Sequence, residues 1–362
     1  MIEIDGSYLE GGGQIIRTAL ALSAITQKPF HAANVRKGRE KPGLKNQHLF
    51  SVHAVQKLCN AKVEGDFIGS TELTFTPGPI EGKTISIDIQ TAGSVALLLQ
   101  AILPPSMFAD KKVHLKIIGG TCGTHAAPYE YFENVLLPHL KKFADIKSQL
   151  VRRGYFPKGN GEIDLVIKPK FTLTDDIVSF SNLKENGPRI ILTEQCNLIS
   201  IKGISHASSD LENAQVAERQ AKGARQMLTS FNVPISIRTE YSQTLSTGSG
   251  ITLWAIFSKD QNEIDENNPI RLGSDALGER GKRAETVGEE AASKLKGYIN
   301  SKAPADPHFA DQILPFMALT SNSIIKTAEI TNHARTNIYT IEKFLGKVFG
   351  VDDKNKIIST IS

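Results

Sequence analysis

Apolar and polar residues follow two different periods along the chain, and these periods alternate in a repeating order. Stretches with apolar residues three or four positions apart predict helices, and shorter stretches with every second residue apolar predict strands. One unit recurs three times: an apolar helix, a strand, a loop rich in glycine or polar residues, and a second amphipathic helix. The first helices are expected at Gly13–Ile25, Gly93–Leu103 and His308–Leu319, the strands at Phe30–Val35, Val113–Ile118 and Ile324–Ile330, and the second helices at Asn46–Leu58, Tyr129–Phe143 and Thr336–Phe349.

Further strands at Glu72–Thr76 and Glu162–Ile167 close the first two units. The pattern therefore predicts an α/β (α+β) fold in which three βαβαββ-type repeats form a large domain, with helices packed on one face of each sheet.

Between about residues 183 and 270 this order changes, because the segment has strands of its own and one long polar helix, Asn213–Ser230. Polar stretches bound the segment at both ends. We therefore expect a smaller α/β domain at 183–270, inserted into the large domain of residues 1–182 and 271–362.

The composition is that of an ordinary globular protein, with 40% hydrophobic and 22% charged residues. The net charge of +4 is too small to demonstrate a nucleic-acid partner, but basic residues cluster locally. Within ten residues, next to the single acid Glu40, the chain carries Arg36, Lys37, Arg39, Lys41 and Lys45. This run is either a solvated face or a set of phosphate contacts.

Three cysteines, Cys59, Cys122 and Cys196, lack the CxxC spacing. Their spacing favours a reducing compartment and argues against a disulfide scaffold or a zinc site. No signal peptide is recognisable, and no apolar run reaches the length of a membrane span. We therefore expect a soluble protein of the cytoplasm.

A glycine-rich turn precedes the first helix and is the strongest candidate for chemistry. Gly11 to Gly13 allow backbone N–H groups to approach an anion, and the helix start adds partial positive charge. The carboxylate of Glu10 and the guanidinium of Arg17 flank the turn, an arrangement that suits a phosphate accompanied by a divalent cation. The alternative is a tight strand–helix turn with solvated charges, since the spacing matches neither a Walker loop nor a Rossmann fingerprint.

The start of the second helix in each repeat carries further candidates. Arg39 and Gln47 can contact a phosphate, and Pro128 can lie flat against a base. A histidine at a helix N-terminus, as expected for His333, is pushed towards its neutral form and keeps a lone pair for attack. His308, at the start of the first helix of the third repeat, is the alternative nucleophile or a flat surface for stacking. Equivalent positions in three repeats predict that these helix starts converge on one anion-binding cleft.

At these residues the chain resembles the RNA 3′-terminal phosphate cyclase family. The matching motifs follow the order of the family along nearly the whole chain. They are Asp5-Gly6-Ser7, Glu10 to Arg17, Arg39 to His48, Thr91 to Ser94 with Gln100, Gly119-Gly120-Thr121, Arg153 to Gly159, Ala310-Asp311-Gln312 and His333.

The resemblance implies three repeats like the C-terminal domain of a translation initiation factor, plus one inserted domain. It also implies a reaction in three steps that uses ATP and a divalent metal, Mg or Mn, on an RNA with a 3′-terminal phosphate. A histidine takes AMP from ATP, AMP passes to the RNA 3′-phosphate, and the neighbouring 2′-hydroxyl displaces AMP to leave a 2′,3′-cyclic phosphate. AMP makes the phosphate monoester a better electrophile because it is a good leaving group.

By the same resemblance, His333 is the nucleophile and Glu10 binds the metal. The RNA phosphate is expected to contact Gln14, Arg17, Arg39 and Gln47. The adenylate pocket is expected to contain Gln100, Pro128, His308, Phe309, Ala310, Asp311 and Gln312. A rival hypothesis is a catalytically silent relative that acts as a ribosome-assembly or RNA-binding factor.

Overall fold

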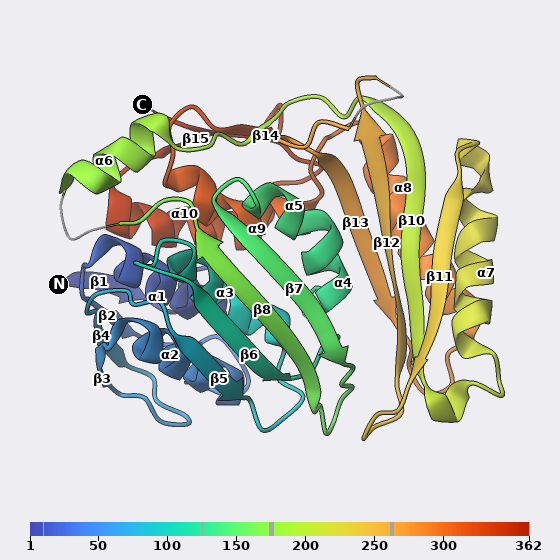
Figure 1. Cartoon of the computed structure of the whole chain (residues 1–362), viewed down its shortest axis with the longest axis horizontal. Coiled ribbons are helices and arrows are strands. Elements are labelled where there is room, and N and C mark those ends of the chain that lie inside the picture. Colours follow the sequence, from blue (N-terminus) through green and yellow to red (C-terminus); the bar gives the residue numbers. More distant parts are fainter. Residues whose placement is uncertain (10, 125, 174–176, 261–263, 362) are drawn as a thin grey trace.

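The computed structural model of the chain describes residues 1–9, 11–124, 126–173, 177–260 and 264–361. These residues form four sheets of four strands each, with helices packed against them (Figure 1). Every one of these sheets contains both parallel and antiparallel pairs, so the predicted α/β (α+β) class is confirmed.

The first sheet lies at the N-terminal end of the molecule. Its first two strands are parallel and the other pairs are antiparallel. Phe30 and Ala32 of the second strand are buried while His31 and Ala33 are partly exposed, so every second side chain points towards the helices. The strands in sheet order are β1 (Ile2–Asp5), β2 (Phe30–Ala33), β4 (Leu73–Thr76) and β3 (Lys62–Glu64), and the helices are α1 (Gln14–Thr26) and α2 (Asn46–Cys59).

The second sheet has the same strand order and the same strand directions. Its second helical segment, predicted as one helix, changes to π-helical hydrogen bonding in the middle. The strands in sheet order are β5 (Thr84–Asp88), β6 (Val113–Gly119), β8 (Gly161–Pro169) and β7 (Ala144–Arg152). The helical elements are α3 (Val95–Ser106), α4 (Tyr129–Tyr131), η1 (Phe132–Leu136) and α5 (Leu137–Leu140).

The third sheet again begins with a parallel pair followed by two antiparallel pairs. Its strands in order are β9 (Ile191–Leu192), β14 (Ile324–Lys326), β16 (Ile357–Thr360) and β15 (Phe349–Asp352), and its helices are α9 (Pro307–Ala318) and α10 (Asn332–Leu345). The helix predicted from Thr336 begins four residues earlier because the Thr331 side chain accepts a hydrogen bond from the Ala334 N–H and caps it.

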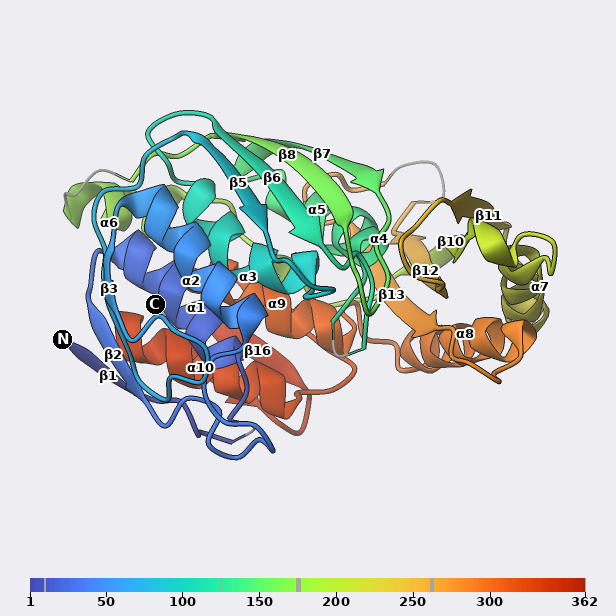
Figure 2. The ribbon, with the colours of Figure 1, turned by 90° about the horizontal axis from the view of Figure 1, so that it is seen from below.

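The shared topology brings the helices together in one layer. Buried along almost its whole length, α1 packs against α2, α3 and α10. The view from below shows these helices and α9 side by side between the first and second sheets (Figure 2). A helix is the next element after β1, β2, β5, β6 and β14 of the parallel pairs, so the N-termini of several helices lie near one another.

A fourth sheet forms the part of the molecule farthest from the chain ends (Figure 1). Its strands in order are β11 (Ile235–Ser242), β10 (Asn197–Ser208), β12 (Ser249–Ser258) and β13 (Ile270–Leu277), and α7 (Val216–Leu228) and α8 (Ala284–Asn300) pack on it and on each other. The helix α6 (Ile177–Asn186) precedes β9. Because β9 pairs with the third sheet and α8 packs on the fourth, we propose limits of 197 and 300 for the inserted domain in place of 183 and 270.

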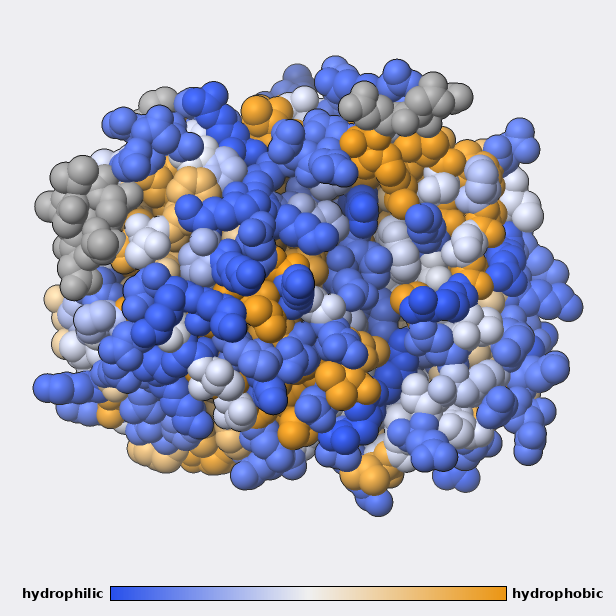
Figure 3. Space-filling model, viewed as in Figure 1, coloured by the Kyte–Doolittle hydropathy of each residue, from blue (hydrophilic) through white to orange (hydrophobic). Residues whose placement is uncertain are grey.

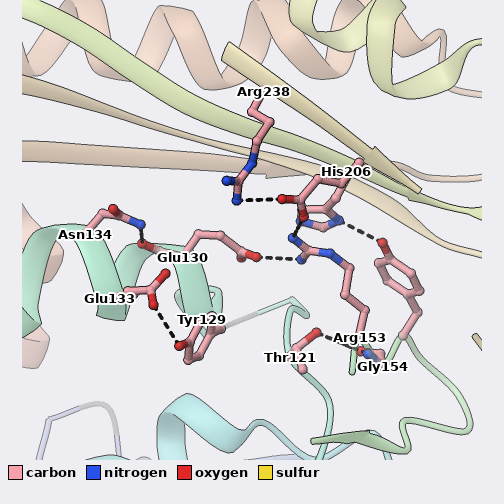
Figure 4. A network of polar contacts seen from close by, with 11 residues as sticks. Thr121, Tyr129, Glu130, Glu133, Asn134, Arg153, Gly154, His206 and Arg238 are labelled. Atoms are coloured by element: carbon pink, nitrogen blue, oxygen red, sulfur yellow. Dashed lines mark hydrogen bonds and ion pairs between the residues drawn. The ribbon is translucent and has the colours of Figure 1, made fainter. Parts of the chain in front are cut away.

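The inserted sheet meets the second sheet through polar contacts. Arg153, which is 3% exposed, lies 2.6 Å from Glu130 and 2.7 Å from Glu240 of β11 (Figure 4). Nearby, the Tyr155 hydroxyl is 2.8 Å from Nδ1 of His206. Hydrophilic residues border this boundary in the space-filling view (Figure 3). The junction is therefore held by buried charge pairs as well as by packing.

Candidate active site

The N-termini of α1 and α10 meet, and this contact joins residues 319 positions apart. The side-chain N–H of Gln14 donates to the carbonyl oxygen of His333, at 3.2 Å. The Gln14 Oε1 lies 2.6 Å from Nδ1 of His333. His333 is the second residue of α10 and is exposed, whereas Gln14 is buried.

This pair of contacts determines which ring nitrogen of His333 carries the proton. The amide of Gln14 must present its nitrogen to the His333 carbonyl, so its oxygen faces the imidazole. An amide oxygen can only accept a hydrogen bond, and therefore Nδ1 of His333 carries the proton and donates it to this bond. In the neutral ring, Nε2 then holds the lone pair that a nucleophile needs.

Arg17 follows one turn later on the same side of α1. Its Nε donates to Oε1 of Gln100 on α3, at 3.0 Å, and its side chain is buried. Burial lowers the pKa of Arg17 to about 10, against the opposing effect of the Asp311 carboxylate. Arg17 is therefore a cation at neutral pH, held inside the protein where an anion would interact with it strongly.

Two residues that the sequence analysis missed connect three helices at this point. The Thr18 hydroxyl donates to Oδ1 of Asn337 at 2.6 Å, and the Asn337 amide donates to the carbonyl of Asp311 at 2.7 Å. Asn337 lies four residues after His333 on α10, and Thr18 lies four residues after Gln14 on α1. This spacing on one helix face is the signal that could have identified them.

A pocket opens between these helices. Its walls are mainly apolar, and its polar groups come from α1, α3, α9 and α10. It is lined by Thr18, Ala96, Leu99, Gln100, Leu103, Pro104, Ala127, Phe132, Leu136, Leu140, Asp311, Gln312, Pro315, Phe316 and Asn337. Three of the residues expected in an adenylate pocket, Gln100, Asp311 and Gln312, are among them.

The other four expected residues do not line this pocket. Pro128 is buried directly before α4, beside Ala127, which does line it. Phe309 and Ala310 are buried in the core, and the Phe309 ring packs 4.5 Å from that of His139. His308 is exposed and turns its ring edge-on towards Tyr131, at 6.2 Å between centroids. Of the first four residues of α9, Pro307 to Ala310, His308 is the exposed one, because consecutive residues of a helix point in different directions.

Arg39 and Gln47 approach the site from the first sheet. A Cβ atom built on Gly12 would lie 3.5 Å from Nη2 of Arg39, so this guanidinium lies against the glycine turn. Gln47 is the second residue of α2, and its Cβ would lie 3.3 Å from one built on Gly93. Both side chains thus face loops that precede α1 and α3.

His48 lies beneath the glycine turn and explains why Gly13 is a glycine. A Cβ on Gly13 would lie 1.9 Å from Nε2 of His48, so any side chain there would force the buried His48 ring to move. The His48 Nδ1 accepts a hydrogen bond from the Lys45 N–H, at 3.1 Å. Burial, helped by the charges of Arg17, Arg36 and Lys45, lowers the pKa of His48 to about 3, so its ring is neutral at physiological pH.

Glu10, the residue expected to bind a metal, lies outside the described residues. Among the residues that the structure does describe, no group of three or more histidine, cysteine, aspartate or glutamate side chains is placed to hold a metal ion. Cys59, Cys122 and Cys196 are free thiols. The metal role of Glu10 therefore stays a prediction.

A family model described as RNA 3′-terminal phosphate cyclase matches residues 8–351. The chain belongs to the RNA 3′-terminal phosphate cyclase family. A cyclase of this name from Pyrococcus furiosus is 45% identical over 362 residues, covering 99% of this chain and 98% of the relative. The cyclase from Archaeoglobus fulgidus is 42% identical, and the match covers 99% of this chain and 99% of the relative. The cyclase from Saccharolobus islandicus is 43% identical, and the match covers 98% of this chain and 97% of the relative.

Membership of the cyclase family confirms the resemblance that the motifs indicated, and it confirms that the chain belongs to a family of enzymes. The match to the cyclase model includes both Gln14 and His333, the two residues that join α1 to α10. In the described part of the chain, no helix is both long enough and apolar enough to cross a lipid bilayer.

Proposed function

We propose that this protein is an ATP-dependent RNA 3′-phosphate cyclase that works through a covalent adenylate on His333. The observation that carries the proposal is the Gln14–His333 contact at the junction of two helix N-termini, beside the buried cation of Arg17. The printed names of the relatives, RNA 3′-terminal phosphate cyclase, support the same activity.

In the proposed first step, Nε2 of His333 attacks the α-phosphorus of ATP. A nitrogen–phosphorus bond forms, the bond to the β-phosphate oxygen breaks, and pyrophosphate leaves with the electron pair. Gln14 supports this step because its Oε1 accepts a hydrogen bond from the Nδ1–H of His333 and so orients the ring. The N-terminus of α10 adds partial positive charge where the phosphates would lie.

The pocket between α1, α3, α9 and α10 is the proposed site of the adenine base of ATP. Its cavity is about 30 Å³, so these helices would have to separate to admit the base. Its largely apolar walls would then cover the base, and Gln100 and Gln312 offer amide groups for its polar edge. We therefore propose these two residues, with Asp311, as adenylate contacts. Pro128 and the buried residues Phe309 and Ala310 would support the pocket from behind, and His308 would stack at its margin.

In the second step, a 3′-phosphate oxygen of the RNA attacks the phosphorus of the adenylate, and the bond to His333 breaks. In the third, the neighbouring 2′-hydroxyl loses its proton to solvent and attacks the 3′-phosphorus, and AMP leaves. Arg17, Arg39 and Gln47 are the proposed contacts of the RNA phosphate, since two cations and an amide can stabilise its charge. Magnesium or manganese at Glu10 would add positive charge there.

Incubation of the purified protein with α-labelled ATP and a divalent metal tests the proposal. We expect the unaltered protein to take up AMP, His308→Ala to take it up more slowly because a stacking contact with the base is lost, and His333→Ala to take up none. Both histidines are exposed and occupy the second position of a helix, so His308→Ala is a matched control. The unaltered protein should also convert an RNA 3′-phosphate to a 2′,3′-cyclic phosphate. Failure of AMP uptake and of cyclisation would favour a catalytically silent relative.

A further inference from the structure

The loop between β2 and α2 carries an exposed set of cations beside the proposed phosphate contacts. The exposed basic side chains of this loop, which runs over residues 34–45, are Lys37, Arg39, Lys41 and Lys45. Glu40 is its only acid. One member of the set, Arg39, lies against the glycine turn at the proposed active site.

The buried Arg36 holds this loop in one shape. Its Nη1 donates to the carbonyl oxygens of Lys41 and Gly43, each at 2.8 Å. Arg36 is 7% exposed, so its charge serves the loop backbone and not a ligand on the surface. The exposed cations therefore project from an ordered backbone, which reduces the entropy lost on binding.

A second loop packs against the first and presents apolar side chains. The N–H of Gly69 donates to the carbonyl of Leu44 at 2.8 Å, and the N–H of Leu44 donates to the carbonyl of Ser70 at 2.9 Å. On this loop, between β3 and β4, Phe67 is 63% exposed and Ile68 is 55% exposed. This loop has two acids: Asp66, which lies 3.2 Å from Nε2 of His53, and Glu72, which is exposed directly before β4.

We propose that these two loops bind the RNA strand that leads to the 3′-terminal phosphate, with an unpaired base stacked on Phe67 and backbone phosphates at Lys37, Lys41 and Lys45. The inference rests on the proposed function. Cations interleaved with an exposed aromatic ring are the combination by which proteins hold single-stranded nucleic acid without reading its sequence. Continuity favours RNA over a protein partner, because Arg39 belongs both to this loop and to the proposed phosphate site.

The test measures binding of a labelled 3′-phosphorylated RNA of about ten nucleotides, a typical length for a single-strand site, in the absence of ATP. The variants are Phe67→Ala, Phe67→Tyr and Lys41→Gln. Phe156→Ala is the matched control, because Phe156 is also highly exposed, at 78%, on the loop between β7 and β8. A 3′-phosphorylated dinucleotide, which carries the terminal phosphate but little of the strand that leads to it, serves as the second ligand.

We expect Phe67→Ala to weaken binding of the longer RNA about tenfold, as loss of one base stack would, and Phe67→Tyr to restore it. Lys41→Gln should reduce the slope of log Kd against log salt by about 0.7, the value for one phosphate contact on a single strand. Phe156→Ala should bind the longer RNA as tightly as the unaltered protein does, and Phe67→Ala should bind the dinucleotide as tightly as the unaltered protein does. Equal binding by Phe67→Ala and the unaltered protein, or an equal loss in Phe156→Ala, would overturn the inference.

Uptake of AMP is measured separately on the same variants and should equal that of the unaltered protein. Absence of AMP uptake by the unaltered protein would contradict the proposed function, whereas the binding comparison without ATP tests the two loops by themselves. Selective capture of a protein with no change in RNA binding would also overturn the inference.

Discussion

At the scale of single residues, the contact between Gln14 and His333 carries the chemistry. Gln14 touches the imidazole on the nitrogen that does not attack, so it acts as a positioning residue. Its amide also holds the first turn of α10 through the His333 carbonyl. Two bonds from one side chain fix both the ring and the backbone that carries it.

Substitution of Gln14 should therefore slow AMP uptake without abolishing it. We expect Gln14→Ala to reduce the rate roughly 10²-fold, the cost of a misplaced reacting group. Gln14→Glu keeps an acceptor for Nδ1 and should recover much of the rate at neutral pH. Because a carboxylate favours the imidazolium, this variant should lose more activity in acid than the unaltered protein does. A pH profile of AMP uptake measures both effects; identical profiles for Gln14→Glu and the unaltered protein would exclude the positioning role.

At the scale of elements, Asn337 holds α10 against α1 and α9. Asn337→Ala would remove the hydrogen bonds that the Asn337 amide makes with the Thr18 hydroxyl and the Asp311 carbonyl. We expect a loss of about 1–3 kcal/mol in the free energy of unfolding, because both bonds lie inside the protein. Thr18→Val should cost less in the Asn337→Ala background than alone, because the two residues form one bond. Urea unfolding of the four proteins tests this, and strictly additive losses would disprove the coupling.

The elements themselves were largely predictable from apolar periodicity, and their ends were not. The expected strand Ile324–Ile330 stops at Lys326, and the helix expected at Thr336 starts at Asn332 because of the Thr331 cap. The π-helical turn within Tyr129–Phe143 adds an extra residue to the helix, which a fixed period does not detect. The first three sheets each have one parallel pair of strands followed by two antiparallel pairs, and this common topology agrees with the helix–strand units that recur in the sequence.

For the candidate site, the order of the motifs along the chain indicated the candidate residues but not which of their side chains are in contact. No local pattern predicts that residue 14 bonds to residue 333, since tertiary packing alone brings these helices together. The sequence did not indicate Thr18 and Asn337 because their side chains form hydrogen bonds between helices and carry no reactive group. On α9, His308 points to the surface while Phe309 and Ala310 point into the core, although the three are consecutive in the sequence. The cytoplasmic location and the metal at Glu10 stay predictions.

At the scale of the whole molecule, Arg153 and Glu240 join the inserted sheet to the second sheet. Burial raises the pKa of Glu240, but the hydrogen bond and charge of Arg153 and the charge of Arg238 outweigh it, so the pKa lies below 4.5. A carboxylate with a lowered pKa stabilises the fold at pH values above 4.5. This contribution disappears as the pH falls through the lowered value in the folded protein.

We therefore expect Glu240→Gln to lose about 1–3 kcal/mol in the free energy of unfolding at pH 7, because it removes a charged partner of a buried guanidinium. The difference from the unaltered protein should shrink as the pH falls below 4.5. Glu162→Gln is the matched control, since Glu162 is also 28% exposed and pairs with the exposed Arg152. This control should lose less than about 1 kcal/mol. A loss in Glu240→Gln that does not change with pH would contradict the account of this junction.

The most direct measurement maps the AMP adduct to a peptide. After incubation with ATP and metal, trypsin digestion at neutral or alkaline pH preserves an acid-labile bond between phosphorus and nitrogen. Cleavage after Lys326 and Arg335 releases Thr327–Arg335, in which His333 is the one histidine, whereas His308 falls in the peptide Ala303–Lys326. Mass spectrometry should find the added mass of one AMP on Thr327–Arg335. Its appearance on Ala303–Lys326, or on neither peptide, would contradict the assignment of His333 as the nucleophile.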